Sequence, residues 1–382
     1  MRNRAELIFW FETPPKVSKG AFNYVSRNWG NKVFYICRRD LSQERKATKW
    51  DDGDFGDAEV IMLSQHPDPD VIVEKIFNAH PNAIHIVAGF DIPMTRQIKK
   101  YILKKDMNVA VFCERPDMMG GAIERLARSM YFKYKYSKLR RLFDPYVEVF
   151  LPLGMKGVNT FASYGWDRKK MYPFMYNPII KKKNASSIDE KMHEGPIRFL
   201  YVGRFYYKTK GIDTLMKACQ MLAGDWKLDL VGGYGKDREG VLNWAKGQEK
   251  VEFLGVWPSE EVCNNIMNYD VVVVPAKYEG WNMLPNEAIH AGVGVIITEE
   301  ATSDELIASS GAGVVLPYND PRALAKAMQS VIDKPELAQT WKKKASSFID
   351  RISSPVVGEY FMDVLDCTFY YNGREKPKCP WL

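Results

Sequence analysis

The chain has 382 residues, a formal net charge of +7, 46% apolar residues and 13% aromatic residues. This length is sufficient for two domains with separate cores, and the apolar content excludes an intrinsically disordered chain. Six cysteines lie without metal-ligand spacing and indicate free thiols in a reducing compartment, and no apolar run reaches the length of a signal peptide or of a membrane span, about 18 residues.

The first half of the chain alternates apolar runs with helix-like stretches. The predicted strands are 6–10, 32–37, 58–63, 83–88, 108–113, 147–151 and 172–174. This alternation predicts an α/β fold with a parallel, doubly wound sheet, whose ligands bind at the carboxyl ends of the strands. Two strand-end loops carry candidate residues, Lys19 with Gly20 and Glu114 with Arg115. Solvated lysines and a structural ion pair explain these residues about equally well.

The most basic stretch runs from Arg125 to Arg141 and interleaves lysines and arginines with aromatic side chains. A basic helix with aromatic residues is typical of segments that bind a membrane surface carrying anionic lipid. An ordinary helix with its aromatic side chains inward and its lysines outward accounts for part of the pattern. Because no recognised RNA-binding module surrounds the stretch, we expect no nucleic acid partner.

The second half begins after a polar segment at 179–196, which we interpret as a linker. The predicted strand at 197–202 ends in Gly203 and Arg204, and Lys210 precedes the next helix. Arg204 and Lys210 are six residues apart across one loop, so they can converge on a diphosphate from two sides.

The segment 275–292 joins a buried strand to a helix that we expect to begin near Met283 and Leu284. The start of such a helix offers free N–H groups that suit a phosphate. Glu287 lies about one turn inside the helix and suits sugar hydroxyls, and Glu279 lies on the preceding loop, where it can face a second sugar. Two surface glutamates beside an ordinary turn are the plainer explanation of this spacing.

The residues around this segment resemble one family in order. The matching positions are Gly203-Arg204, Lys210-Gly211, the Glu-x7-Glu of Glu279 and Glu287, Ser303 to Ile307, Gly311 to Pro317 and Asp320 to Ala325. From about 198 to 332 the chain resembles the retaining glycosyltransferases of family four, the glycosyl transferases group 1. The resemblance implies the GT-B fold, two Rossmann-like domains whose parallel sheets face each other across a cleft.

The implied domains are residues 1–185, which bind the acceptor, and residues 186–354, which bind the nucleotide sugar. Residues 355–382 are expected to cross back onto the first domain, with the polar tail 371–382 on the surface. The family loop after the first strand usually carries a pair of glycines, of which Gly20 remains here. Lys19, Gly20, Glu114 and Arg115 are therefore the acceptor-binding candidates.

The resemblance also assigns roles to residues of the second domain. Glu279, Arg204 and Lys210 are the catalytic candidates, and the donor-binding candidates are Arg204, Lys210, Gly203, Gly233, Val256, Asn282, Met283, Leu284 and Glu287. Asn282 stands where the family commonly has glycine. We expect no metal or other cofactor, because Asp68 and Asp70, which resemble the metal-binding pair of the GT-A fold, lie in a helix-entry loop with two prolines, where N-capping is the stronger explanation.

The resemblance implies a retaining, metal-independent hexosyl- or N-acetylhexosaminyltransferase in cell-surface polysaccharide synthesis. It would move a sugar from a nucleotide sugar, a UDP-sugar in preference to a GDP-sugar, to a glycan or lipid-linked acceptor. We expect the protein in the cytoplasm or peripherally on the cytoplasmic face of the membrane. Two alternatives stay open, a GT-B nucleotide-sugar epimerase and a non-catalytic protein that binds nucleotide sugars.

Overall fold

The computed structural model describes residues 4–41, 53–180, 195–371 and 375–382. The chain forms two compact units, each with its own apolar core. The first unit contains Met1–Pro116, Arg125–Ile179 and Ser353–Pro380, and the second contains Asp117–Glu124, Ile180–Ile352 and Trp381–Leu382. The predicted domain boundary at 185–186, with most of the predicted linker, lies outside the described residues.

The first unit is built on a six-stranded parallel sheet with strand order β3-β2-β1-β4-β5-β6. The strands are β1 (Leu7–Phe11), β2 (Val33–Cys37), β3 (Glu59–Met62), β4 (Ile84–Ala88), β5 (Asn108–Cys113) and β6 (Val149–Pro152). Every residue of β1 is buried, as expected for a central parallel strand that is covered on both faces. The strand order reverses between β1 and β4, which makes their carboxyl ends the switch point of this sheet.

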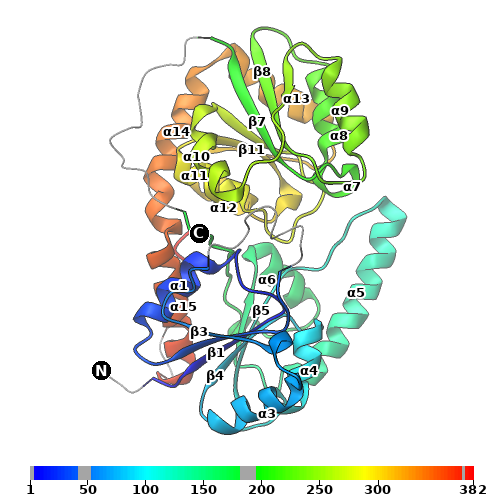
Figure 1. Cartoon of the computed structure of the whole chain (residues 1–382). Helices are drawn as coiled ribbons and strands as arrows, with labels where there is room; N and C mark the ends of the chain where they lie inside the picture. Colours follow the sequence, from blue (N-terminus) through cyan, green and yellow to red (C-terminus); the bar gives the residue numbers. More distant parts are fainter. Residues whose placement is uncertain (1–3, 42–52, 181–194, 372–374) are drawn as a thin grey trace. The chain divides into compact units, whose positions relative to one another are not determined.

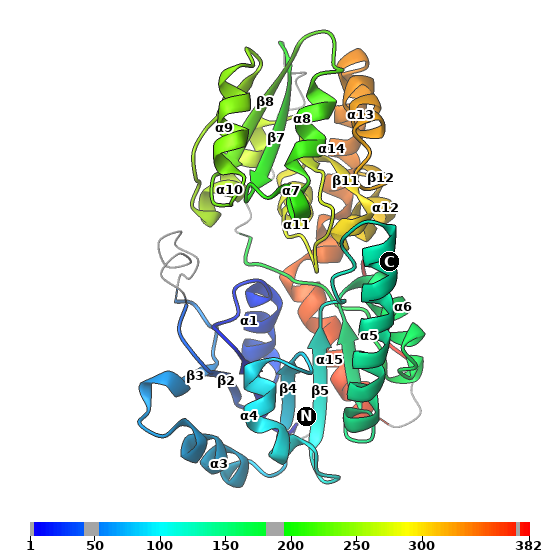
Figure 2. The same ribbon diagram turned by 90° about the vertical axis from the view of Figure 1, so that its right-hand side faces the viewer.

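Helices flank the first sheet (Figures 1 and 2). They are α1 (Lys19–Asn28), η1 (Leu63–Gln65), α3 (Pro69–Ala79), α4 (Pro93–Ile102), α5 (Ala122–Phe143), α6 (Gly154–Ser163), η2 (Arg168–Lys170) and α15 (Ser354–Phe369). The Asp68 carboxylate accepts from the N–H groups of Asp70 and Val71 at 3.1 and 3.3 Å, which confirms its predicted role as a helix N-cap. Helix α15 packs on α1, where a Cβ at Gly358 would lie 2.6 Å from the Tyr24 ring.

The second unit repeats the plan with strand order β12-β11-β10-β7-β8-β9, all parallel. Its strands are β7 (Ile197–Gly203), β8 (Trp226–Gly232), β9 (Val251–Phe253), β10 (Val271–Val274), β11 (Gly294–Thr298) and β12 (Gly313–Leu316). Its helices are α7 (Tyr207–Lys210), α8 (Ile212–Cys219), α9 (Arg238–Lys246), α10 (Ser259–Asn265), η4 (Ile266–Asn268), α11 (Leu284–Ala291), η5 (Glu299–Ala301), α12 (Asp304–Ser310), α13 (Pro321–Asp333), α14 (Glu336–Phe348) and η6 (Ile349–Ile352). Here the order reverses between β7 and β10. The predicted α/β fold with parallel, doubly wound sheets is confirmed in both units.

Two sequence-based expectations are wrong. The predicted strand at 172–174 forms only isolated bridges beside β6, although the N–H groups of Tyr172 and Phe174 donate to the carbonyls of Phe150 and Pro152 at 2.8 and 2.9 Å. The tail 371–382 was expected on the surface, and this expectation is wrong at Trp381, which is fully buried and whose Nε1 donates to Glu305 Oε1 at 2.9 Å. A large indole gains more from burial than the polar residues around it lose, provided that its N–H finds an acceptor.

Candidate functional site

The predicted donor-site residues converge at the switch point of the second sheet. Strands β7 and β10 are hydrogen-bonded neighbours, so the loops that follow them begin side by side at one edge of the sheet. The loop after β7 carries Arg204 and Lys210, and the loop after β10 carries Glu279 and Asn282. The next strand, β11, contributes a third loop at 299–303. This edge is where a doubly wound sheet binds its ligands.

Lys210, Glu279 and Asn282 meet at one carboxylate oxygen. Lys210 Nζ donates to Glu279 Oε1, and Asn282 Nδ2 donates to the same oxygen at 3.5 Å. The side chains of Lys210 and Glu279 are only 17% and 15% exposed. Because reduced exposure to water weakens solvent screening, this ion pair holds Glu279 more firmly than a surface pair would. The sequence analysis places Lys210 at a diphosphate and Glu279 at a sugar, and in the structure these two side chains form an ion pair.

Further contacts bind the β10 loop to the β7 loop. The Lys277 N–H donates to the Thr209 carbonyl at 2.8 Å, and Lys277 Nζ donates to Asp213 Oδ2 at 2.8 Å. Gly211 has a φ of +65°, and a Cβ there would lie 1.8 Å from the Pro275 carbonyl oxygen. Only glycine permits this approach. Lys210 therefore supplies the positive charge, and Gly211 supplies the close backbone contact that holds Lys210 in place.

Thr302 supports Glu279 from the loop after β11. Its φ of 56° and ψ of −42° put it at the centre of a γ-turn that the Ser303 N–H closes by donating to the Ala301 carbonyl at 2.6 Å. A β-branched residue rarely adopts positive φ, and such strain persists where the surroundings over-determine it. The Thr302 hydroxyl donates to the Glu279 carbonyl at 2.8 Å, and the Glu279 N–H donates to the Glu300 carbonyl at 3.0 Å.

The helix predicted near Met283 is α11, with Met283 as its N-cap residue and Gly292 in the left-handed region at its end. The Leu284 N–H donates to Asn282 Oδ1 at 2.9 Å. The expectation that this N–H is free to bind a phosphate is therefore wrong in this structure, because the Asn282 side chain caps the helix. Glu287 is half-buried in the first turn of α11, as its position in the sequence predicts.

The remaining donor-site candidates lie on the loops around this network. Gly203 is the last residue of β7, and the Arg204 guanidinium carbon lies 5.3 Å from the centre of the Tyr206 ring. Gly233 follows β8 with a φ of +134°, and Val256 follows β9 and is 44% exposed. Arg204 and Lys210 thus leave the same loop but face different partners.

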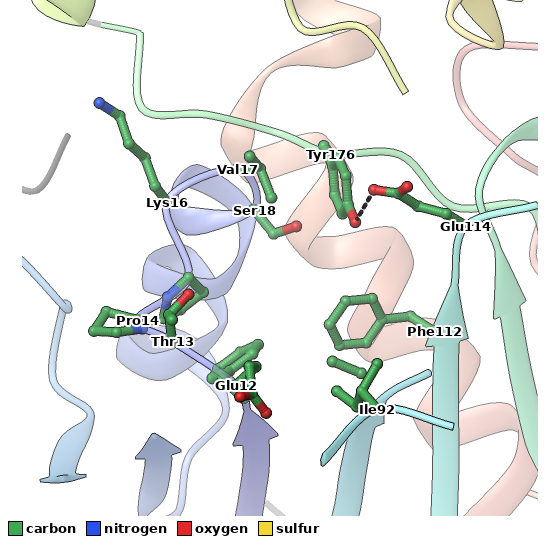
Figure 3. A pocket seen from close by; sticks show the side chains of 13 residues that line it. Glu12, Thr13, Pro14, Lys16, Val17, Ser18, Ile92, Phe112, Glu114 and Tyr176 are labelled. Carbon is green, nitrogen blue, oxygen red and sulfur yellow. Dashed lines mark hydrogen bonds between the residues drawn. The ribbon is translucent and has the colours of Figure 1, made fainter. Parts of the chain in front are cut away.

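The acceptor-site candidates lie in the first unit, where a pocket of about 240 Å³ occupies the switch point of the sheet (Figure 3). Its walls come from the loops after β1, β4 and β5 and from Tyr176. Glu114 lines it and accepts a hydrogen bond from the Tyr176 hydroxyl at 2.7 Å. Arg115, which is 7% exposed, is not part of the lining.

Lys19 and Gly20 are also absent from the lining of this pocket. They begin α1, and Lys19 is 3% exposed with its Nζ 4.5 Å from the centre of the Phe55 ring. The Gly20 N–H donates to the Asn177 carbonyl at 2.8 Å, and a Cβ at Gly20 would lie 2.4 Å from Ser354 Oγ. The structure uses both residues for packing, because α1 and α15 lie too close for a ligand at Gly20.

Comparisons with known proteins find relatives for the second half of the chain. The model of the family described as glycosyl transferases group 1 matches residues 182–348. This part of the chain is therefore similar to the group 1 glycosyltransferases. The amylovoran biosynthesis glycosyltransferase AmsK of Erwinia amylovora is 29% identical over 191 residues, 47% of this chain and 46% of that protein. The glycogen synthase of Mycobacterium tuberculosis is 26% identical over 165 residues, 42% of this chain and 39% of that protein. The chain spans less than half the length of the curated relatives it matches.

The likeness to solved glycosyltransferase structures extends beyond the group 1 segment. Anabaena Alr3699/HepE, solved in complex with UDP, has a TM-score of 0.71 at 12% identity, over 95% of this chain and 100% of that chain. The lipopolysaccharide outer core galactosyltransferase WaaB has a TM-score of 0.65 at 16% identity, over 94% and 99% of the two chains. At these identities the likeness concerns the fold, and it confirms GT-B with two Rossmann-like domains.

Two residues of interest escaped the reading of the sequence. Thr302 carries no local signal, because a threonine disfavours positive φ, and Ser18 is one of many small polar residues in the chain. Across the described residues, no group of three or more His, Cys, Asp or Glu side chains is arranged to hold a metal ion. No helix in the described ranges has the length and apolar character needed to cross a membrane.

Proposed function

We propose that this protein is a glycosyltransferase that moves a sugar from a nucleotide sugar to a glycan or lipid-linked acceptor, with retention at the anomeric carbon. The observation that carries the proposal is the convergence of Lys210, Glu279 and Asn282 at the switch point of the second sheet. A cation and a carboxylate joined in a half-buried pair suit a ligand in which a diphosphate and a sugar are adjacent.

In this proposal, Arg204 and Lys210 bind the donor diphosphate. A lysine ammonium has three donors, so Lys210 can keep Glu279 and donate to a phosphate oxygen at the same time. Lys210 then sets Glu279 beside the sugar that the diphosphate carries. Arg204 leaves the same loop and supplies a planar fork that matches phosphate oxygens. The half-buried Glu287, one turn into α11, accepts from the ribose hydroxyls.

Negative charge develops on the departing diphosphate as the glycosidic bond breaks. Arg204 and Lys210 stabilise this charge from fixed positions, so no metal ion is required in the proposed mechanism. Glu279 contacts the transferred sugar rather than the nucleotide, because it precedes the helix on the loop. Its contact contributes to the rate to the extent that it strengthens in the transition state.

The fold and the relatives support a particular donor and context for this proposal. Alr3699/HepE was solved with UDP, and AmsK is named for amylovoran biosynthesis. We therefore propose a UDP-sugar donor of the hexose or N-acetylhexosamine type and a place in cell-surface polysaccharide synthesis. We also propose that the enzyme works in the cytoplasm, where its six free cysteines would stay reduced.

The test is a panel of UDP-glucose, UDP-galactose, their N-acetylhexosamine analogues and GDP-mannose, incubated with the protein in the presence of a chelator. A transferase releases the nucleoside diphosphate, slowly to water and faster to an acceptor glycan. An epimerase would convert the sugar without releasing the nucleotide. Conversion without release, or binding without either reaction, would overturn the proposal, and an activity that only added Mn²⁺ or Mg²⁺ restores would overturn its metal-free form.

We further propose that α5 attaches the enzyme to anionic membranes through its outer face. Phe132, Tyr136 and Leu139 pack against the core of the first unit. Leu126, Met130 and Tyr134 recur every four residues on the opposite face and are 64%, 67% and 70% exposed. Exposed cations border them: Lys133, Lys138 and Arg141. Apolar side chains among exposed cations match an interface of acyl chains and anionic headgroups.

Flotation with liposomes that contain an anionic lipid tests this surface. Replacement of Lys133, Lys138 and Arg141 by glutamate should abolish flotation, because each cation near the surface contributes about 1 kcal/mol. The matched control replaces Lys99, Lys104 and Lys105 by glutamate and makes the same change in charge on exposed positions near α4. If both triple variants lost flotation equally, the net charge of the protein would explain membrane binding without a specific surface. Equal flotation of all three proteins would refute the membrane surface.

A further inference from the structure

The pocket at the switch point of the first sheet is lined by both apolar and polar side chains, and this lining indicates the kind of ligand that fits. Phe112 and Ile92 form an apolar floor, and Glu114 with Tyr176 forms a polar wall (Figure 3). The cavity of about 240 Å³ is smaller than the roughly 300–1,000 Å³ of pockets for drug-sized ligands. A single small ring therefore fits better than an extended chain.

Ser18 supplies the observation that points to a missing partner. It lines the pocket and is 1% exposed, and its hydroxyl oxygen has no hydrogen-bond partner among the described atoms. Figure 3 shows this oxygen directed toward the space in front of Tyr176. A buried hydroxyl without a partner is unfavourable, so a ligand that bonds to Ser18 relieves a cost already present in the fold.

The charges of the pocket select among ligands. Glu12 lies at its base and is compensated by Arg38 and Arg39, each 3.0 Å from Oε1, while Oε2 accepts from the Met94 N–H at 3.2 Å. Glu114 on the opposite wall accepts from a neutral phenol. The Lys16 ammonium extends away from the pocket (Figure 3). A phosphate or carboxylate placed beside Glu114 would face a like charge, whereas a hydroxyl can donate to Glu114, since a carboxylate has about four lone-pair sites.

We propose that this pocket binds one neutral, hydroxyl-rich sugar ring of the acceptor, with its C–H face on Phe112 and hydroxyls on Glu114 and Ser18. The inference rests on the proposed transferase function for the word acceptor, but the pocket and its preference for a neutral ring stand apart from it. Sugar phosphates and uronic acids are rejected at this position. The acceptor unit held in this pocket is therefore uncharged, whatever charges the rest of the acceptor carries.

Ligand-observed NMR with the full chain tests the pocket without requiring activity. The probes are neutral methyl hexosides, the matching hexose 6-phosphates and the matching hexuronic acids. We expect a neutral hexoside to bind to the wild type. Its affinity should fall about tenfold in Ser18→Ala, because one hydrogen bond is lost. The exposed Ser163 hydroxyl in the same unit gives the matched control, Ser163→Ala, which should bind as the wild type does.

Glu114→Gln keeps an acceptor oxygen and removes the charge, so it should reduce the preference for neutral over anionic sugars. Unchanged UDP affinity and thermal unfolding would show that the variants are folded. Three outcomes would each overturn the pocket proposal. No neutral hexoside binds, or the affinity is the same in Ser18→Ala as in the wild type, or anionic sugars bind as tightly as neutral ones. Neutral-ring binding in a protein that releases no nucleotide would instead refute the transferase function and leave the pocket standing.

Discussion

The two sheets share a topology and differ in the chemistry of their switch points. In the first unit, the crevice between β1 and β4 presents Glu114, a phenol, a buried hydroxyl and an apolar floor. In the second, the loops after β7 and β10 present Arg204, Lys210 and Glu279, and Lys210 pairs with Glu279. In our proposal, identical strand order decides where a ligand binds, and a few residues on two or three loops decide whether that ligand is a neutral ring or a diphosphate.

The two crevices are also held in different ways. The second is a network in which the loops after β7, β10 and β11 bond to one another through Lys277, Thr302 and the Lys210–Glu279 pair. In the first, the loop after β1 leads directly into α1, whose start packs against α15 at Gly20. The bonded loops of the second crevice hold a reacting side chain in position. In the first crevice, the packing of α1 on α15 instead fixes the walls of a preformed pocket. The following changes test this division of labour.

The largest effect is expected at Glu279. Glu279→Gln should lower kcat by about 10²–10³-fold, the range for loss of one preorganised electrostatic contact, while UDP affinity stays near that of the wild type. The control is Glu114→Gln, which should act mainly on acceptor KM. Kinetics with separate titration of UDP would measure both. If Glu279→Gln abolished UDP binding and left kcat unchanged, the carboxylate would belong to the nucleotide and the comparison would fail.

The cations of the second crevice should govern nucleotide affinity. Arg204→Ala and Lys210→Ala should each weaken UDP binding by about 1.5–3 kcal/mol, the value of a hydrogen bond to a charged group. Calorimetry with UDP and GDP provides the measurement, and Lys208→Ala, an exposed lysine on the same loop, is the matched control. If Lys208→Ala and Lys210→Ala weakened UDP binding equally, the overall charge of the loop would explain the loss without a specific contact.

The first sheet should be sensitive to acid through His85. This residue is fully buried, its Nδ1 accepts from Trp10 Nε1 at 3.1 Å, and burial lowers its pKa from 6.5 to about 3. The unfolded chain then binds the proton between these values, so stability is lost as the pH falls below about 6.5, by up to about 1.4 kcal/mol per pH unit.

Urea unfolding at pH 7 and pH 5 would detect a loss of about 2 kcal/mol from this residue. His85→Gln keeps a side chain that can accept from Trp10 and does not titrate, so its stability should change less between the two pH values. A variant with the same acid sensitivity as the wild type would show that other groups cause it.

The smallest effect concerns the support of Glu279 by Thr302. Thr302→Val keeps the shape and removes the hydroxyl, and it should lower kcat about fivefold to tenfold with little change in UDP affinity, because one hydrogen bond is worth about 1 kcal/mol. Thr302→Ser should restore the rate. Thr302→Gly relieves the backbone strain without restoring the hydroxyl, so a stable but slow variant would separate the two roles. Wild-type rates in Thr302→Val would remove the hydroxyl from the site.

Local sequence determines a large part of this protein. The alternation of apolar runs with helical stretches predicts the first sheet. Asp68, Pro285 and Gly292 mark helix ends through side-chain capping, a fixed φ and the left-handed conformation. These signals are readable because capping, periodicity and glycine conformations depend on residues within a few positions of one another.

Tertiary structure alone decided the contacts that give the two crevices their character. Lys210 and Glu279 are 69 residues apart and meet only because β7 pairs with β10. Thr302 contradicts its own preference for negative φ, and the packing of the loop after β11 against Glu279 overrides it. The buried hydroxyl of Ser18 becomes informative only once the loop after β1 closes on the pocket. In each case parallel strand pairing brings distant loops to one edge, and no local pattern encodes which side chains then touch.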